Sequence, residues 1–185
     1  MKITSLAIPD VKLVTPNIFR DDRGFFSETF NVRALASGGV AGHFVQDNHS
    51  LSVQQGVVRG LHYQLPPTAQ DKLMRVTRGS ILDVAVDIRR GSPTYGQHVA
   101  VTLSADNWEQ LWVPKGFAHG FCTLEPNTEV VYKVTDYYAP EFDRGLRWND
   151  PDLGIKWPVT AESAVLSAKD AVTPMFRQLD SPFQY

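Results

Sequence analysis

The feature that most limits the fold of this chain is the alternation of apolar and polar side chains in short segments. Residues 81–88 place four aliphatic side chains on one face of a predicted strand, and Asp83 and Asp87 on the other face. Alternation with a period of two is expected for a strand with one buried face and one face in water. Further strands are expected at residues 44–53, 57–65, 73–77, 98–103, 110–113 and 128–138.

Turn-forming residues separate these segments, since the chain has 12 prolines and 13 glycines. Such spacing between short strands indicates a sandwich or a barrel. Short helices are expected only at residues 31–36 and 167–171, with Ser167 as a candidate N-cap, and the tail after Thr173 looks irregular. We predict an all-β fold, a cupin-type double-stranded β-helix or jelly-roll barrel with a few short helices, forming a single domain over residues 1–185.

The composition excludes several classes of partner. The net charge is -2 at pH 7, so neither nucleic acid nor an anionic membrane is an expected partner. No apolar run approaches the ~20 residues that span a bilayer. The single cysteine, Cys122, cannot form an intrachain disulfide and lies in an apolar run, which indicates a buried thiol. With no signal-peptide pattern at the N-terminus, we expect a cytoplasmic protein.

Two histidine motifs, Gly60–Gln64 and Pro114–His119, raise the question of a metal. In metal-binding cupins the first motif carries His-x-His followed by a Glu, and the second carries Pro-x-Gly-x-x-His. The second motif matches here, but the first retains only His62, with Gln64 at the next ligand position and Lys72 downstream. A catalytic divalent site normally needs three or more histidine or carboxylate ligands, so we predict no metal and no other cofactor. Two histidines and a lysine instead suit anion binding and proton transfer.

Local sequence alone favours ordinary structural roles for most of the remaining polar residues. His43, His49 and His98 are expected to be hydrogen-bonded structural residues. Tyr132 shares a strand face with two valines, which is typical of a tyrosine in a barrel wall. Asp170 would be a solvated or capping aspartate.

Seven segments, taken in order, resemble the dTDP-4-dehydrorhamnose 3,5-epimerase family over nearly the whole chain. The segments are Arg23–Glu28, Phe44–Ser50, Val58–Gln64, Gln70–Leu73, Asp83–Asp87, Pro114–Phe121 and Leu166–Asp170. The resemblance implies that His62 is a general base held by Asp170. It further implies that Tyr132 is a general acid on the opposite face of the sugar, and that Lys72 faces the C4 oxygen.

The resemblance also implies how a dTDP-linked 4-keto-6-deoxy sugar is bound. The sugar and phosphate contacts would be Gln46, Asn48, Arg59 and His119, and the contacts at the nucleotide end would be Arg23, Glu28, Asp143 and Lys169. Phe26 and Tyr138 would be platforms for the thymine ring. Members of this family are expected to be homodimers whose N-terminal strands cross the dimer, so Arg23, Phe26 and Glu28 would serve the partner's site. The usual destination of the product is rhamnose for cell-surface polysaccharide such as lipopolysaccharide.

The chemistry of such a substrate agrees with these roles. The hydrogens at C3 and C5 are acidic because both carbons flank the C4 ketone, so epimerisation needs a base, an acid on the other face and stabilisation of an enolate. Imidazole titrates near neutrality and phenol stays protonated at pH 7. One feature conflicts with strict alternation, which puts Arg59 and His62 on opposite faces; a bulge at Gly60 would bring both to one cavity.

Three other functions fit parts of the pattern. An enzyme that epimerises only C3 or only C5, or a ketoisomerase of the same substrate, would share the fold and the nucleotide contacts. A metal-dependent cupin would need ligands that Gln64 and Lys72 do not supply. A non-catalytic sugar-binding jelly roll gives no reason for His62, Tyr132 and Lys72 to occur together.

Overall fold

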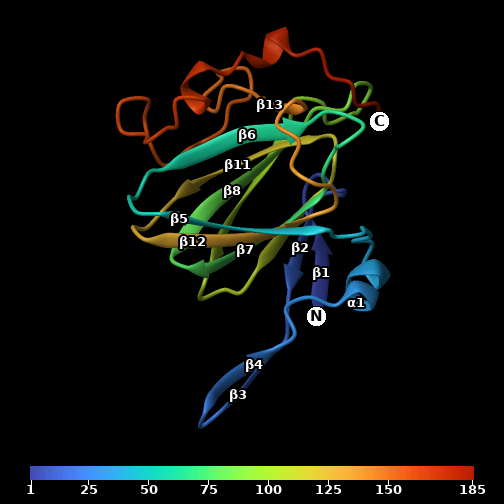
Figure 1. Ribbon diagram of the computed structural model, residues 1–185, viewed down its shortest axis with the longest axis vertical. Helices are drawn as coiled ribbons and strands as arrows, with labels where there is room; N and C mark the ends of the chain where they lie inside the picture. The colour runs from blue at the N-terminus through green and yellow to red at the C-terminus, as the bar shows by residue number, and fades with distance from the viewer.

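The computed structural model describes residues 1–185 and contains two antiparallel sheets and a separate hairpin (Figure 1). The first sheet has six strands in the order β1 (Lys2–Ser5), β2 (Lys12–Thr15), β10 (Gln110–Val113), β7 (Lys72–Arg78), β12 (Thr128–Val134) and β5 (Gln46–Ser52). The second has five strands in the order β13 (Asp143–Gly145), β6 (Val58–Gln64), β11 (Phe117–Thr123), β8 (Ser80–Asp87) and β9 (His98–Ser104). The predicted jelly-roll fold is confirmed.

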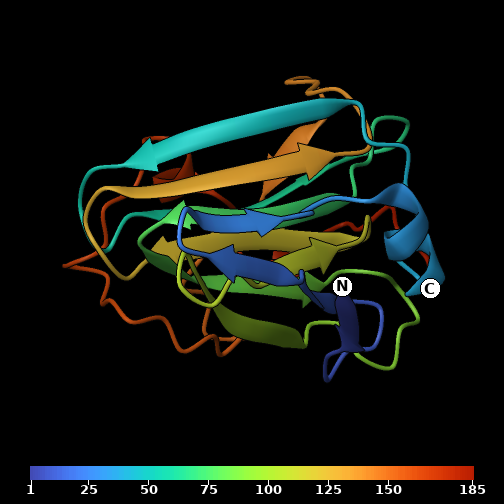
Figure 2. The same ribbon diagram turned by 90° about the horizontal axis from the view of Figure 1, so that it is seen from below.

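All seven predicted strands are present, with boundaries that differ by a few residues. The largest difference is the strand expected at residues 128–138, because β12 ends at Val134 and the chain then turns along the end of the barrel. The alternation did not predict β11, whose seven residues are all buried and therefore show no polar face. Figure 2 shows β12 lying beside β5 (orange and cyan) at one edge of the six-stranded sheet.

The expectation that the face with Asp83 and Asp87 is in water was wrong. Both aspartates are fully buried on β8, on the same face as Ile81 and Ala85, which pack against the opposite sheet. The other face of β8 carries Val84 and its aliphatic neighbours, which are covered by residues from the C-terminal third of the chain. Figure 1 shows this C-terminal segment (red) along the outer side of β6. Both faces of the strand are therefore covered, and the carboxylates point into the barrel.

The expected bulge at Gly60 is confirmed. His62 pairs with His119 across β6 and β11, but Arg59 pairs with Phe121, so three steps along β6 match two steps along β11. Gly60 has a φ of 126°, and a Cβ atom there would lie 2.5 Å from the Cα of Gly120. Only glycine fits this position, because a side chain would collide with the neighbouring backbone.

Helical structure is short, as expected. Helix α1 (Val32–Ser37) begins after Asn31, whose side chain accepts a hydrogen bond from the Ala34 amide at 3.1 Å. The helix expected at 167–171 is a single 3-10 turn, η1 (Asp170–Val172), and the Ser167 hydroxyl accepts a hydrogen bond from the Asp170 amide at 3.1 Å. A second turn, η2 (Phe176–Gln178), interrupts the tail. None of these helices has the length and apolar character needed to cross a membrane.

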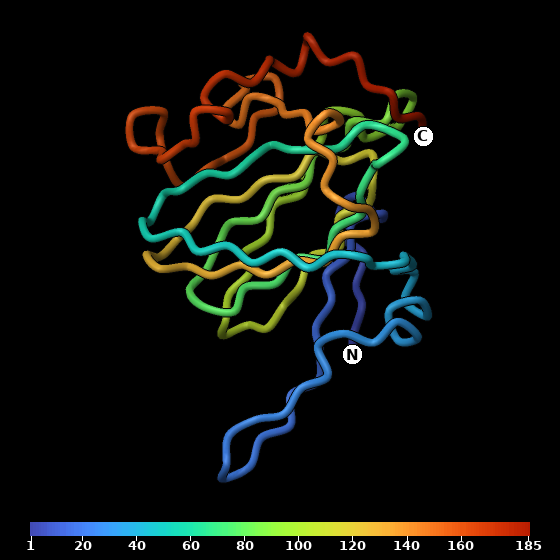
Figure 3. Tube along the Cα trace, viewed as in Figure 1, coloured from blue at the N-terminus to red at the C-terminus, as the bar shows by residue number.

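The hairpin of β3 (Ile18–Asp21) and β4 (Gly24–Ser27) extends away from the two sheets, as Figures 1 and 3 show. Its aromatic side chains are largely in solvent, with Phe26 70% exposed. Exposed phenylalanines on a projecting hairpin are unusual for a chain in water.

Candidate active site

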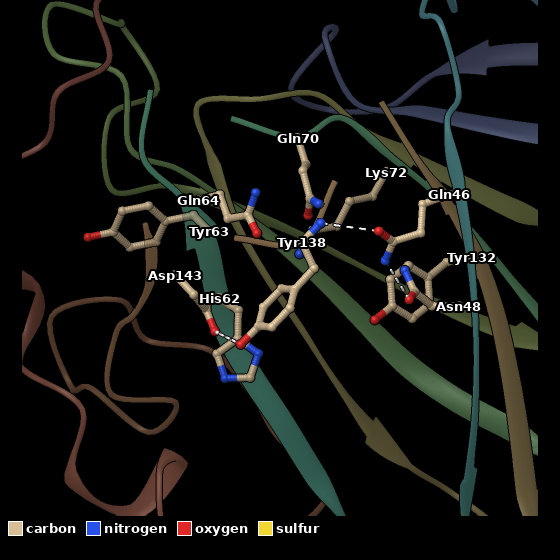
Figure 4. Close-up of a pocket in the computed structure, with 10 residues that line it drawn as sticks. All are labelled: Gln46, Asn48, His62, Tyr63, Gln64, Gln70, Lys72, Tyr132, Tyr138 and Asp143. Carbon is tan, nitrogen blue, oxygen red and sulfur yellow. Dashed lines mark hydrogen bonds between the residues drawn. The ribbon is translucent and has the colours of Figure 1, made fainter. Parts of the chain in front are cut away.

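Two adjoining cavities lie between the sheets and share His62, Lys72 and Tyr132 in their walls. One, of about 320 Å³, is mostly polar and is drawn in Figure 4. The other, of about 460 Å³, adds an apolar wall that includes Met74 and Phe121. The three shared side chains come from β6, β7 and β12, so the closure of the barrel brings them together.

His62 is held by a carboxylate from the far end of the chain. Its Nε2 lies 2.5 Å from Oδ1 of Asp170, which is buried on η1. Burial alone would raise the pKa of Asp170, but the hydrogen bonds from His62 and Ser167 outweigh it and lower that pKa. An ionised carboxylate fixes the orientation of the imidazole and stabilises its protonated form. Because Nε2 is occupied, Nδ1 is the nitrogen that remains for a substrate.

Tyr132 reaches the same space from the other sheet. It is paired with Asn48 on β5 and with Met74 on β7, and its face of β12 is the one that carries Val130 and Val134. Burial raises the pKa of the Tyr132 phenol, which therefore stays protonated at neutral pH. An imidazole and a phenol consequently stand on opposite walls of one cavity.

Lys72 is the first residue of β7 and its amine lies at the junction of the two cavities. Burial lowers the pKa of Lys72 to about 8, while the nearby carboxylates of Asp143 and Asp83 oppose this shift. The ammonium form therefore predominates at neutral pH, but it is less strongly solvated than a surface lysine. A cation in such surroundings interacts strongly with a developing negative charge.

His119 forms a second histidine–carboxylate pair. Its Nε2 lies 2.6 Å from Oδ1 of Asp83, and both residues are buried. Burial lowers the pKa of His119, although Asp83 acts in the opposite direction. The other oxygen of Asp83, Oδ2, is buried without a hydrogen-bond partner. The sequence did not single out Asp83 for the site, because its alternating strand predicted a solvent-facing aspartate.

The predicted absence of a metal stays a prediction, but three of the side chains at the cupin ligand positions, those of His62, Gln64 and His119, already have hydrogen-bond partners. His62 and His119 each direct Nε2 to a carboxylate. The Gln64 carboxamide donates to the carbonyls of Thr68 and Tyr137 and accepts from the Ala139 amide. This arrangement suits proton transfer more closely than ion binding.

Five more of the predicted contacts surround the mouth of the polar cavity or lie beside it. Gln46, Asn48, Tyr138 and Asp143 line it, and Lys169 forms an ion pair with Asp143. The Tyr138 hydroxyl donates to Asp143 at 3.2 Å, and the side chain is 57% exposed. Figure 4 shows the Tyr138 ring near His62, with its hydroxyl directed to Asp143.

Arg59 lies on the wall of the apolar cavity, as the bulge at Gly60 requires. It donates hydrogen bonds to the Ser52 hydroxyl at 3.3 Å and to the Leu51 carbonyl at 3.2 Å. These bonds fix a cation beside the cavity where an anionic group could bind.

Three predicted residues are not brought to this site. Arg23 and Phe26 lie on the β3–β4 hairpin and Glu28 follows it, and none of them lines either cavity. The Arg23 guanidinium pairs with Asp21 within the hairpin. In a single chain all three residues are exposed. The hairpin itself projects from the two sheets in Figure 3.

Comparison with known proteins agrees with this geometry. A family model described as dTDP-4-dehydrorhamnose 3,5-epimerase matches residues 5–178. The dTDP-4-dehydrorhamnose 3,5-epimerase of Sinorhizobium fredii is 53% identical over 185 residues, which cover 100% of this chain and 94% of that protein. This chain belongs to the dTDP-4-dehydrorhamnose 3,5-epimerase family. It is therefore an enzyme of the isomerase class.

Two solved structures extend the family likeness. The dTDP-6-deoxy-D-glucose-3,5-epimerase of Legionella pneumophila, in complex with dTDP-4-keto-L-rhamnose, has a TM-score of 0.93 and 46% identity, and covers 100% of this chain and 98% of its own. A 3'-monoepimerase of Streptomyces bikiniensis, in complex with dTDP-quinovose, has a TM-score of 0.85 and 33% identity, and covers 92% and 86%. The same fold thus also occurs in an enzyme that is described as a monoepimerase.

Proposed function

We propose that this enzyme converts dTDP-4-dehydro-6-deoxy-D-glucose to dTDP-4-dehydro-L-rhamnose by inverting C3 and C5. The observation that carries the proposal is the shared cavity of His62, Tyr132 and Lys72, with the base and the acid on opposite walls. The 53% identity to a 3,5-epimerase over the whole chain supports the same substrate.

In the first step, Nδ1 of His62 removes the proton from a carbon next to the C4 ketone. The electron pair of the broken C–H bond forms a C=C bond to C4, and the carbonyl electrons move to the C4 oxygen. The Lys72 ammonium stabilises this enolate oxygen, and Asp170 stabilises the imidazolium. The ketone itself accepts the electrons, so the chemistry needs no redox cofactor.

In the second step, the Tyr132 hydroxyl donates a proton to the opposite face of the same carbon. The C=C bond collapses, the ketone re-forms and the configuration is inverted. Before the other carbon reacts, His62 loses its proton to solvent and Tyr132 regains one. The raised pKa of Tyr132 keeps this acid protonated between the two inversions.

The nucleotide would lie across the mouth of the cavity. We expect Arg59 and Lys169 to contact the diphosphate, Gln46, Asn48 and His119 to contact the sugar or phosphate, and Tyr138 to stack on thymine. Asp143 holds both Tyr138 and Lys169 and would position this end of the site.

The exposed hairpin supports a homodimer in which residues 18–28, here called the arm, complete the partner's site. Arg23, Phe26 and Glu28 lie outside the cavities of their own chain, yet the family resemblance assigns them to the nucleotide end. A partner's arm would bring a cation and a second aromatic ring to the side of the nucleotide opposite Tyr138. It would also bury the exposed phenylalanines.

We further propose that residues 1–185 act as one catalytic domain in the cytoplasm. Both sheets contribute to the same cavities, which supports a single functional unit. The only cysteine is buried, and burial raises its pKa to about 11, which suits a thiol with no redox role.

Incubation with dTDP-4-keto-6-deoxyglucose in D2O tests the reaction. Deuterium is expected at both C3 and C5, together with inversion at both carbons, as measured by NMR. The second candidate is inversion of C3 alone, favoured by the likeness to the Streptomyces monoepimerase. Label at one carbon only would establish that narrower activity, and label at neither would contradict both.

A further inference from the structure

Three glutamines hold the short segment that carries Tyr138. Gln70 donates to the Asp136 carbonyl at 2.8 Å, and Gln64 donates to the Tyr137 carbonyl at 3.1 Å. Gln46 accepts from the Tyr138 amide at 3.1 Å, and Gln64 also accepts from the Ala139 amide at 2.9 Å. One backbone group of each of four consecutive residues, 136–139, is therefore bonded to a glutamine side chain.

These glutamines come from separate parts of the barrel. Gln46 begins β5, Gln64 ends β6 and Gln70 lies just before β7, so both sheets contribute. All three line the polar cavity, and Figure 4 shows their side chains around Tyr138. A segment beyond the end of β12 would otherwise lack ladder partners, and its mobility would blur the position of any side chain that it carries.

Gln64 is the centre of the arrangement. It is only 5% exposed, and its carboxamide uses both donor and acceptor groups by bonding the carbonyls of Thr68 and Tyr137 and the amide of Ala139. A carboxylate could not donate to the two carbonyls, and a histidine could not make all three bonds. The residue that stands where metal-binding cupins have a ligand is thus committed to backbone groups.

We propose that Gln46, Gln64 and Gln70 form a clasp that fixes the Tyr138 ring in the position where it receives the nucleobase. Gln64 and Gln70 are then positioning residues, which act on the ligand through Tyr138. This inference rests on the proposed role of Tyr138 in stacking. It goes further because it says that uncharged side chains inside the cavity hold the ring in a fixed position.

The clasp should therefore affect how tightly the nucleotide binds and not how fast the bound substrate reacts. Loosening the clasp should raise KM for the dTDP-sugar and the dissociation constant for dTDP, because the platform must be ordered when the ligand binds. Turnover at saturating substrate should change little, because the hydrogen bonds of the clasp go to backbone groups of Thr68 and residues 136–139, and the side chains of the catalytic residues take no part in them. General loss of structure would instead lower turnover through a smaller active fraction.

A double-mutant cycle on dTDP binding, measured by titration calorimetry, tests the proposal. Gln64→Met and Tyr138→Ala are each expected to weaken binding about tenfold, which corresponds to the loss of one to two net hydrogen bonds or of one stacking contact. The double variant should bind no more weakly than Tyr138→Ala, because the clasp acts through that ring. Gln70→Ala, which removes only the bond to Asp136, should weaken dTDP binding less, and it too should have no further effect when Tyr138 is already Ala. It is the variant to use if Gln64→Met folds poorly.

Gln110→Met is the matched control. Gln110 is also a buried glutamine that donates to a backbone carbonyl, that of Thr29, but it lies away from the Tyr138 segment. Any effect of Gln110→Met on the binding free energy of dTDP should simply add to the effect of Tyr138→Ala, because the two residues act independently. If the fold-changes in the dissociation constant multiply in the Gln64→Met/Tyr138→Ala protein, the proposed clasp is wrong, while the stacking role of Tyr138 is unaffected. Unchanged dTDP binding by Tyr138→Ala would overturn both, without affecting the proton chemistry, which deuterium exchange measures independently.

Discussion

His62 and Tyr132 face one cavity from opposite sheets, His62 from β6 and Tyr132 from β12. They are 70 residues apart in sequence. Two groups attached to separate rigid sheets can hold a planar enolate between them and act on its two faces. This geometry assigns the removal of a proton and its return to two different side chains.

Replacing Tyr132 by Phe removes the acid but keeps the ring. Deuterium should still enter the substrate, since His62 can still form the enolate, whereas inversion should fall by about 100-fold or more. NMR in D2O distinguishes labelled substrate from labelled epimer. Tyr95→Phe, a change at a surface tyrosine, serves as the control and should alter neither rate. Equal losses of exchange and inversion in Tyr132→Phe would argue against a separate acid.

Activity should decline as the pH rises through about 8, because the Lys72 ammonium loses its proton there. The sign follows from the lowered pKa, since the charged form is present below that value and lost above it. Tyr132 titrates later because burial raises its pKa. The Lys72→Arg enzyme, though slower, should keep a flat profile to about pH 10, since guanidinium stays protonated. A Lys133→Arg control should keep the decline of the unchanged enzyme. A decline that persists in Lys72→Arg would assign the titration to another group.

Asp83 supports two groups of the site, because it bonds His119 and opposes the loss of charge on Lys72. Asp83→Asn should lower kcat/KM by about 10- to 100-fold, the usual cost of a charged hydrogen bond. It should also move the alkaline decline to lower pH. Asp87→Asn is matched in strand, face and burial but bonds Arg89 instead, so it should leave that decline in place. The same shift in both variants would mean that Asp83 acts only through folding.

The proposed exchange of arms predicts complementation between two inactive proteins. A chain with Arg23→Ala and Phe26→Ala keeps its cavity, and a chain with His62→Ala keeps its arm. After mixing and re-equilibration, half of the dimers would be mixed and each would have one complete site, giving about a quarter of the wild-type rate. No recovery in demonstrably mixed dimers would exclude a shared site.

The sequence predicted the parts of the fold that local patterns encode. Alternation placed the strand at residues 81–88, and the conflict between the strand faces of Arg59 and His62 located the bulge at Gly60. The seven long motifs identified the family because many residues had to match together. These signals depend on neighbours in the chain, so they can be read without knowing what packs on them.

What remained hidden depends on contacts between distant segments. The burial of Asp83 follows from the closure of the barrel and from the C-terminal cover over β8, neither of which alternation can reveal. Gln64 looked like a missing ligand because two of its three backbone partners, the Tyr137 carbonyl and the Ala139 amide, lie 73 and 75 residues away in the chain. For the same reason, the strand face of Tyr132 suggested only a barrel-wall residue until the opposite wall was known.

The exchange rate of His62→Ala in D2O tests the central claim most directly. If a single imidazole serves both carbons, this variant should incorporate no deuterium at C3 or C5, while His49→Ala, which removes an exposed histidine paired with Glu129, should exchange normally. Exchange at either carbon at the wild-type rate in His62→Ala would contradict the account, because some other group would then be removing that proton.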